Sequence, residues 1–231
     1  MPDRFQRLAG AAITLATPLV LFGNAGLLLL TPWTGDLMYA LPGFPDDPLG
    51  LTGEDRERLA ADGIRSVWPF GAGAEILRDA RLPDGDAAFT EFEITHMEDV
   101  RVLLRGGLLL WFLAFAGAAA AAAALVRRGA GPVAAVAARR GAYLTLGVLA
   151  VSGLAMLVAY ETVFDGFHSL FFADGTWSFA DRYTLRRIYP DAFWSIASAI
   201  IVLLSVIQAG GLIWFARRRE VPAVSSVSAT P

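Results

Sequence analysis

The sequence predicts an all-α polytopic membrane protein with four transmembrane helices and a small extracytoplasmic domain in the first outward loop. Of its 231 residues, 55% are hydrophobic, and the mean hydropathy is +0.52. Four apolar windows reach the roughly 17 to 25 residues that a helix needs to cross a bilayer. These windows are residues 8–31, 102–126, 141–163 and 192–216.

The distribution of arginine predicts how the chain is oriented. Every basic residue apart from the histidines is an arginine, and arginines precede the first window, fill the 127–140 connection and follow the fourth window. Because basic residues in short loops stay in the cytoplasm, both termini and the middle connection are predicted to be cytoplasmic. The predicted segments are 1–31 (N-terminus and first helix), 32–101 (extracytoplasmic domain), 102–126 (second helix), 127–140 (cytoplasmic loop), 141–163 (third helix), 164–191 (aromatic extracytoplasmic loop), 192–216 (fourth helix) and 217–231 (cytoplasmic tail).

The outward segment 32–101 is too long for a simple connection, so we expect it to fold. A turn-rich stretch at 42–48 opens it. Thr52 and Asp55 have capping-box spacing, which predicts a short helix that ends at Gly63. Residues 88–92 are expected to form a short strand.

His96 precedes the second apolar window and is one of only two histidines in the chain. Thr95 and Glu98 have capping-box spacing, which predicts Thr95 as N-cap and His96 in the first helical turn. There the positive end of the helix dipole favours the neutral imidazole. Asp99, three residues after His96, is a candidate to orient that ring, and Glu98 is a second candidate.

His168 follows the third apolar window, so both histidines are predicted at the outward boundary of the membrane. Asp165 is a candidate to orient His168. The surrounding loop is rich in aromatic residues, some of which an aromatic belt at the headgroup level explains. We expect this loop to lie on or dip into the outer leaflet, and its candidate substrate contacts are Phe167, Phe171 and Trp177.

Two arginines interrupt the predicted outward end of the second helix. Arg101 and Arg105 share a helix face with Glu98, at spacings of three and seven residues. One interpretation is an ion-pair network, and the other is binding of a polar substrate group.

Two boundary histidines leave three chemistries open: acid–base catalysis, a metal site completed by a carboxylate, or a structural role. The chain contains no HExxH or HxxEH arrangement and no GxSxG elbow, although Ser169 and Ser178 lie near His168. It also contains no cysteine, which excludes thiolate metal sites, disulfides and a cysteine nucleophile.

Residues 93–100, Glu-Ile-Thr-His-Met-Glu-Asp-Val, resemble the ExxHMxDV signature of the bacterial lipoprotein intramolecular transacylases. Residues 163–172, together with Trp-Ser-Phe at 177–179 and Tyr-Pro-Asp-Ala-Phe-Trp at 189–194, resemble the second signature, VFxxFHxxFFxxxxWxF followed by YPxxFW. The four-span topology with a large first outward loop is similar as well.

This resemblance implies a membrane acyltransferase that acts within one substrate molecule. The sn-2 acyl chain of an S-diacylglyceryl-cysteine lipoprotein would move onto the lipoprotein's own α-amine, giving a lyso-form lipoprotein. His96 would take a proton from the amine, and His168 would polarise the carbonyl or return a proton to the glycerol oxygen.

The implied partners are diacylated bacterial lipoproteins and membrane lipids, with no metal, cofactor or nucleic acid. The implied location is the bacterial cytoplasmic membrane, with the active site at its extracytoplasmic face. The alternatives are a metal-dependent membrane hydrolase that uses the same two histidines and a non-catalytic membrane scaffold protein.

Overall fold

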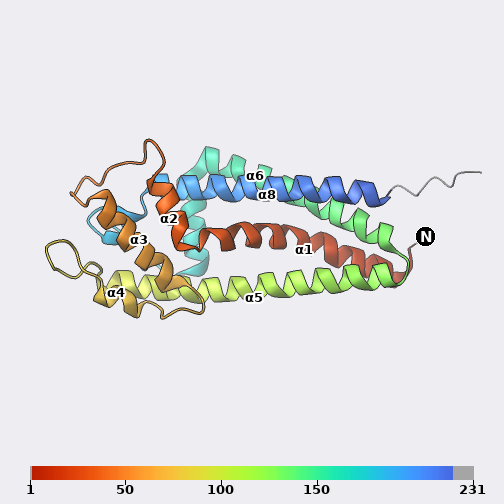
Figure 1. Ribbon diagram of the computed structural model, residues 1–231, viewed down its shortest axis with the longest axis horizontal. Helices are drawn as coiled ribbons and strands as arrows, with labels where there is room; N and C mark the ends of the chain where they lie inside the picture. The colour runs from red at the N-terminus through yellow and green to blue at the C-terminus, as the bar shows by residue number, and fades with distance from the viewer. Residues whose placement is uncertain (1, 221–231) are drawn as a thin grey trace, which may run out of the picture. The chain divides into compact units, whose positions relative to one another are not determined.

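The computed structural model describes residues 2–220, which form helices joined by turns and loops (Figure 1). Four of these helices are long and apolar enough to cross a membrane, which confirms the prediction of an all-α chain with four candidate spans. In chain order the helices are α1 (Arg4–Leu29), α2 (Pro32–Tyr39), α3 (Gly53–Val67), α4 (Glu75–Asp79), α5 (Glu91–Arg127), α6 (Gly131–Phe171), α7 (Thr184–Ile188) and α8 (Asp191–Glu220).

Two of the long helices, α5 and α6, extend well beyond their apolar windows. The 37 residues of α5 correspond to about 55 Å of helix, whereas the hydrocarbon core of a bilayer is about 30 Å thick. In α6, Ala159 has non-helical backbone angles (φ −145°, ψ 49°), so the 41-residue helix is interrupted there. The predicted tail at 217–231 begins within α8, and its residues from 221 onward lie outside the described residues.

The chain divides into two compact units, each built from parts of α1, α5, α6 and α8. The first comprises Met1–Phe22, Trp111–Val151 and Leu204–Pro231. Small residues bring α1 and α6 close together in this unit. A Cβ atom on Gly141 would lie 2.5 Å from Thr17 Cβ, and the Thr14 hydroxyl donates to the carbonyl of Ala137 at 3.1 Å.

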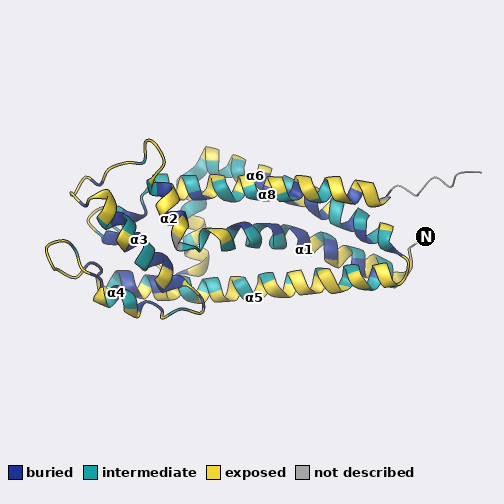
Figure 2. Ribbon diagram, viewed as in Figure 1, coloured by how far each residue is buried: buried dark blue, intermediate teal, exposed yellow. Residues whose placement is uncertain are grey.

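The second unit comprises Gly23–Leu110 and Ser152–Leu203, and it contains both histidines. Its core includes Met38 of α2, Leu59 of α3, Leu77 of α4, Ile94 of α5 and Ile188 of α7. All five side chains are buried, and Figure 2 shows dark blue, buried stretches within α3. Short helices from distant parts of the sequence therefore share one hydrophobic core.

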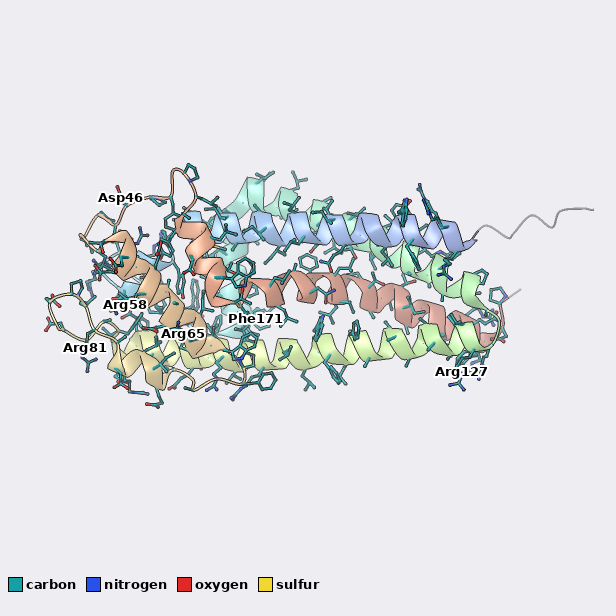
Figure 3. All side chains as sticks on the ribbon, viewed as in Figure 1. Asp46, Arg58, Arg65, Arg81, Arg127 and Phe171 are labelled. Atoms are coloured by element: carbon teal, nitrogen blue, oxygen red, sulfur yellow. The ribbon has the colours of Figure 1, made fainter. Side chains whose placement is uncertain are left out.

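α3 shows how local sequence and tertiary packing both shape this unit. The Thr52 hydroxyl accepts a hydrogen bond from the Asp55 amide, which confirms the predicted cap. The helix does not stop at Gly63 but continues to Val67. Its polar face carries Arg58 and Arg65, which lie at the surface (Figure 3).

Arg56 joins the 32–90 segment to α7. Its guanidinium donates to the carbonyls of Arg187 and Pro45, over distances of 2.6 to 3.1 Å. Arg187 in turn forms an ion pair with Asp47 at 2.7 Å. Breaking a buried pair of this kind by removing one partner typically destabilises a protein by about 3–5 kcal/mol, so this network fixes α7 against the segment.

The strand predicted at 88–92 is wrong. Within residues 2–220 the only β pairing is an isolated antiparallel bridge between Arg81 and Ala87. The following residues turn into α5, because Thr90 caps that helix. Strand propensity at Phe89 and Thr90 is therefore overridden by capping.

Substituting Gly63 with alanine should destabilise the protein, although alanine favours a helix interior over glycine by about 1 kcal/mol. A Cβ atom at Gly63 would lie 2.3 Å from the hydroxyl oxygen of Tyr189, which is itself buried and bonded to the Ala60 carbonyl at 2.7 Å. We expect a loss of about 1–3 kcal/mol, measured as a lower Tm in detergent. Gly53→Ala is the matched control, since no atom lies within 4 Å of its added Cβ. Equal Tm values for the two variants would contradict the proposed close contact.

Candidate active site

The first turn of α5 determines where His96 lies. The Thr90 amide donates to the Glu93 carboxylate at 2.8 Å, and the Glu93 amide donates to the Thr90 hydroxyl at 3.4 Å. This reciprocal capping box starts α5 at Glu91, one turn before the predicted start. The Thr95 hydroxyl instead donates to the Glu91 carbonyl at 2.8 Å, so the predicted cap at Thr95 is wrong. His96 consequently lies in the second turn, where the helix dipole acts more weakly.

Glu93 connects α5 to α7. Its side chain is 1% exposed, and its second carboxylate oxygen accepts a hydrogen bond from the Leu185 amide at 2.8 Å. Beside it, the Thr184 hydroxyl donates to the carbonyl of Ala88. A buried carboxylate is stable only when donors of this kind surround it. The sequence interpretation missed Glu93, although its spacing from Thr90 and its place in the ExxHM motif could have identified it.

The His96 imidazole is enclosed by aromatic rings. Its centroid lies 5.0 Å from that of Phe172 and 5.2 Å from that of Phe179. The main chain of Thr176 also interacts with the ring, and Nδ1 is buried with no hydrogen-bond partner among residues 2–220. Burial among these rings favours the neutral imidazole, which is the form that can accept a proton, whereas the Thr176 main chain favours the charged form.

His168 lies in the last turn of α6, after the interruption at Ala159. Its Nδ1 atom is 2.8 Å from the carbonyl oxygen of Phe164. Because a carbonyl can only accept, we assign the proton to Nδ1, which leaves the lone pair on Nε2. The ring also stacks on Trp177, with centroids 4.9 Å apart and an interplanar angle of 29°.

Phe172 brings the two histidines together. Its ring centroid is 5.0 Å from that of His96 and 5.7 Å from that of His168, so the two imidazole centroids are at most about 10.7 Å apart. Thr176 and Trp177 make a second connection, since the former contacts His96 through its main chain and the latter stacks on His168. Residues separated by 72 positions thus form one aromatic-walled site within the second unit.

The carboxylates predicted to orient the histidines make no hydrogen bond to them. The Nδ1 position that Asp165 was expected to fill is occupied by the Phe164 carbonyl, and Asp165 is exposed. Asp99 is exposed as well, and its influence on His96 is electrostatic only.

Arg101 and Arg105 lie away from the histidines. They follow His96 by five and nine residues, which places them on nearly the opposite side of α5. Arg101 donates to the carbonyl of Gly71, and Arg105 donates to that of Pro69 at 3.0 Å. The expected ion-pair network with Glu98 is therefore wrong. Glu98 instead lies 3.8 Å from Arg78, on the surface.

The three aromatic residues predicted to contact substrate all surround His168. Trp177 stacks on it, as described above. Phe167 makes an edge contact with the same ring at 5.4 Å, and Phe171 packs on Phe167 at 5.0 Å. Phe167 and Phe171 remain half exposed, so this side of the site presents an apolar surface to its surroundings.

No part of the described chain offers a metal centre: residues 2–220 contain no cluster of three or more His, Cys, Asp or Glu side chains that could hold a metal ion. A cavity of about 460 Å³ lies elsewhere in the second unit and is separate from the histidines. Its walls are formed by Leu30, Thr31, Ile64, Arg65, Trp68, Gly71, Ala72 and Ile76. The aromatic site around Phe172 is the better candidate for catalysis, because it holds the ionisable groups.

A family model described as lipoprotein intramolecular transacylase Lit matches residues 78–194. The chain belongs to the lipoprotein intramolecular transacylase family. The matched part of this transacylase includes both histidines, Glu93 and Trp177. A protein of Aquifex aeolicus (strain VF5), described only as uncharacterized, is 28% identical over 204 residues, which cover 87% of this chain and 89% of the relative.

Solved structures of the membrane integral lipoprotein intramolecular transacylase Lit from Bacillus cereus share the fold of this transacylase. One superposes with a TM-score of 0.76 at 19% identity and covers 93% of this chain and 97% of the other. Variants with a histidine replaced by arginine or alanine give TM-scores of 0.69 and 0.71, at 17% and 19% identity. They cover 92% and 93% of this chain, and 91% and 93% of their own.

Glu93→Gln should lower the stability of this transacylase. The amide can replace one acceptor oxygen but places an N–H₂ group against the Thr90 or Leu185 amide. An unsatisfied buried group of this kind destabilises by about 1–3 kcal/mol, which thermal unfolding in detergent would detect. Glu91→Gln is the matched control, because that side chain is 73% exposed and makes only a surface ion pair. A Tm for Glu93→Gln equal to that of the control would show that the contact to α7 contributes little.

Proposed function

We propose that the protein transfers the sn-2 acyl chain of an S-diacylglyceryl-cysteine lipoprotein onto the lipoprotein's own α-amine, giving a lyso-form lipoprotein. The observation that carries this proposal is the pair of histidines on either side of Phe172, in a chain of the transacylase family. The substrates would be diacylated bacterial lipoproteins held in the membrane.

His96 would prepare the amine for attack. An α-amine is largely protonated at neutral pH, and only its neutral form is nucleophilic. The buried, unpartnered Nδ1 of His96 suits proton acceptance. His168 would then transfer a proton through Nε2, because its Nδ1–H donates to the Phe164 carbonyl and its Nε2 carries the lone pair. Nε2 would accept the second amine proton and return it to the glycerol oxygen.

Both reacting groups belong to one molecule, so the main task of the site is to hold a ring-like conformer of the substrate. Such positioning can contribute on the order of 7–11 kcal/mol at best. The aromatic walls formed by Phe167, Phe171 and Trp177 would contact the acyl chains and glycerol. This chemistry requires no enzyme nucleophile and no cofactor.

We also propose that the site lies at the extracytoplasmic face of the bacterial cytoplasmic membrane, with both termini in the cytoplasm. The arginine bias of the 127–140 connection and of the 217–219 run supports this orientation. Residues 32–101 would then form a small extracytoplasmic domain. The hydrophobic core that α2, α3 and α4 share with α7 supports that assignment.

His96→Ala and His168→Ala should each lower lyso-lipoprotein formation by about 10²–10⁴-fold, the usual effect of removing a general acid or base. The double variant should be little worse than either single variant, because groups that act on one transition state are not additive. Mass spectrometry of the N-terminal lipopeptide, after incubation of a diacylated lipoprotein with the purified protein, measures the product.

Each histidine variant must be present in the membrane at the wild-type level for this comparison. A His168→Ala variant that keeps more than about a tenth of wild-type turnover would make His168 structural, since that loss is below the usual range. Release of free fatty acid in place of an N-acylated product, restored after chelation only by added metal, would favour the hydrolase alternative.

Reporter fusions should place the connection after Arg128 and the C-terminus in the cytoplasm, and Asp62 outside. A fluorescent protein should therefore be active at the first two positions, and a phosphatase that needs disulfides should be active at the third. A C-terminus found outside the cytoplasm would contradict the proposed orientation and the location of the site.

A further inference from the structure

Trp177 carries a buried hydrogen-bond donor that has no partner. Its indole stacks on His168 and makes an edge contact with Phe164 at 6.2 Å, and its Nε1 atom is buried without a partner among the described residues. An indole N–H can only donate. Nearly all buried donors in proteins are paired, so an unpaired one in a catalytic site indicates an acceptor that arrives with the substrate.

The position of this donor matches the proposed reaction. Stacking places the indole plane within 29° of the His168 plane, and an N–H bond and an imidazole lone pair both lie in their own ring planes. The Trp177 N–H and the His168 Nε2 lone pair can therefore contact two atoms bound to the same carbon, namely the carbonyl oxygen of the ester and the attacking amine nitrogen. The main chain of the preceding residue, Thr176, interacts with His96, so the 176–177 segment has contacts to both histidines.

We propose that the Trp177 N–H donates to the carbonyl oxygen of the sn-2 ester as that oxygen becomes an oxyanion, which makes Trp177 a catalytic residue. This inference rests on the proposed transacylase function. The amine nitrogen bonds to the carbonyl carbon, the C=O π pair moves onto oxygen, and the nitrogen loses a proton to His168 Nε2. The carbonyl then re-forms, the bond from carbon to the glycerol oxygen breaks, and that oxygen takes the proton from His168. A donor that strengthens its bond as charge develops stabilises the transition state more than the ground state.

The sharpest test removes the N–H and keeps the ring. Benzothienylalanine, incorporated at position 177 by codon suppression, has the shape of tryptophan with sulfur in place of N–H. We expect kcat to fall by about 10²–10³-fold, the usual effect of losing one oxyanion donor, with KM and Tm close to wild type. Trp177→Phe should show a similar loss in kcat. Trp214→Phe is the matched control, because that indole is 58% exposed at the far end of α8.

A binding experiment separates a catalytic donor from a packing role. A lipopeptide whose sn-2 ester is replaced by a charged phosphonate imitates the tetrahedral intermediate, and its Kd should rise at least tenfold in the benzothienylalanine variant. The Kd of a diacylated lipopeptide with a blocked amine should change little.

Three outcomes would overturn the inference about Trp177. A benzothienylalanine variant with kcat within threefold of wild type would show that the N–H is not used while leaving the transacylase function intact. Equal losses of affinity for both probes would assign Trp177 to substrate packing. A wild-type protein that makes no lyso-form lipoprotein would overturn the proposed function itself, and this inference with it.

Discussion

The second unit depends on one buried carboxylate. One carboxylate oxygen of Glu93 accepts from the Thr90 amide at the start of its own helix. The other oxygen accepts from the Leu185 amide in the buried first turn of α7. Each of these amides would otherwise be buried without a partner, which is unfavourable in the interior of a protein. Because α5 carries His96 and the chain leading into α7 carries Trp177, this one side chain fixes the distance between the two halves of the site.

Main-chain carbonyls hold most of the partly buried cations in this unit. Arg56 binds the carbonyls of Arg187 and Pro45, and Arg101 and Arg105 bind carbonyls of the 69–71 turn. Carbonyl partners leave the arginine charge uncompensated and accept from only some of its donors, since Arg101 Nε is buried without a partner among the described residues. The 69–71 turn is thereby attached to α5 on the side opposite His96, so the arginines support the helix that positions the catalytic ring without entering the site.

The sequence predicted the features that depend on local composition. Four spans follow from apolar windows longer than a bilayer requires, and the cap at Thr52 follows from spacing alone. The start of α5 did not follow, because two Thr-x-x-Glu boxes lie five residues apart at Thr90 and Thr95. The contact from Glu93 to Leu185 selects the box at Thr90. Leu185 is distant in the sequence, so the residues around His96 do not reveal this contact. The partners of Arg101 were equally hidden, since a carbonyl acceptor has no sequence signature.

In the site, too, local sequence predicted some features, whereas contacts within the fold decided others. That the two histidines share one site could be inferred from their places beside apolar windows and from the family signatures. Which group contacts each ring could not be inferred. A carboxylate three residues from a histidine, such as Asp99 or Asp165, is the expected partner, whereas the observed partners are main-chain groups of Phe164 and Thr176. Whether the turn before a histidine is helical decides which carbonyl its ring can reach, and Phe164 and His168 both lie in α6.

The bond from His168 to Phe164 has a consequence for substrate entry. Under the proposed function, a lipid-bearing substrate would enter beside the aromatic residues that follow α6. The partner that sets the His168 tautomer is a carbonyl one helical turn earlier in the same helix, so movement of the residues after α6 does not separate the ring from its partner. Loop opening therefore leaves the proton on Nδ1 and the lone pair on Nε2. The Nε2 lone pair of His168 is therefore available at the start of each turnover, whereas His96 must first release the proton that it took from the amine.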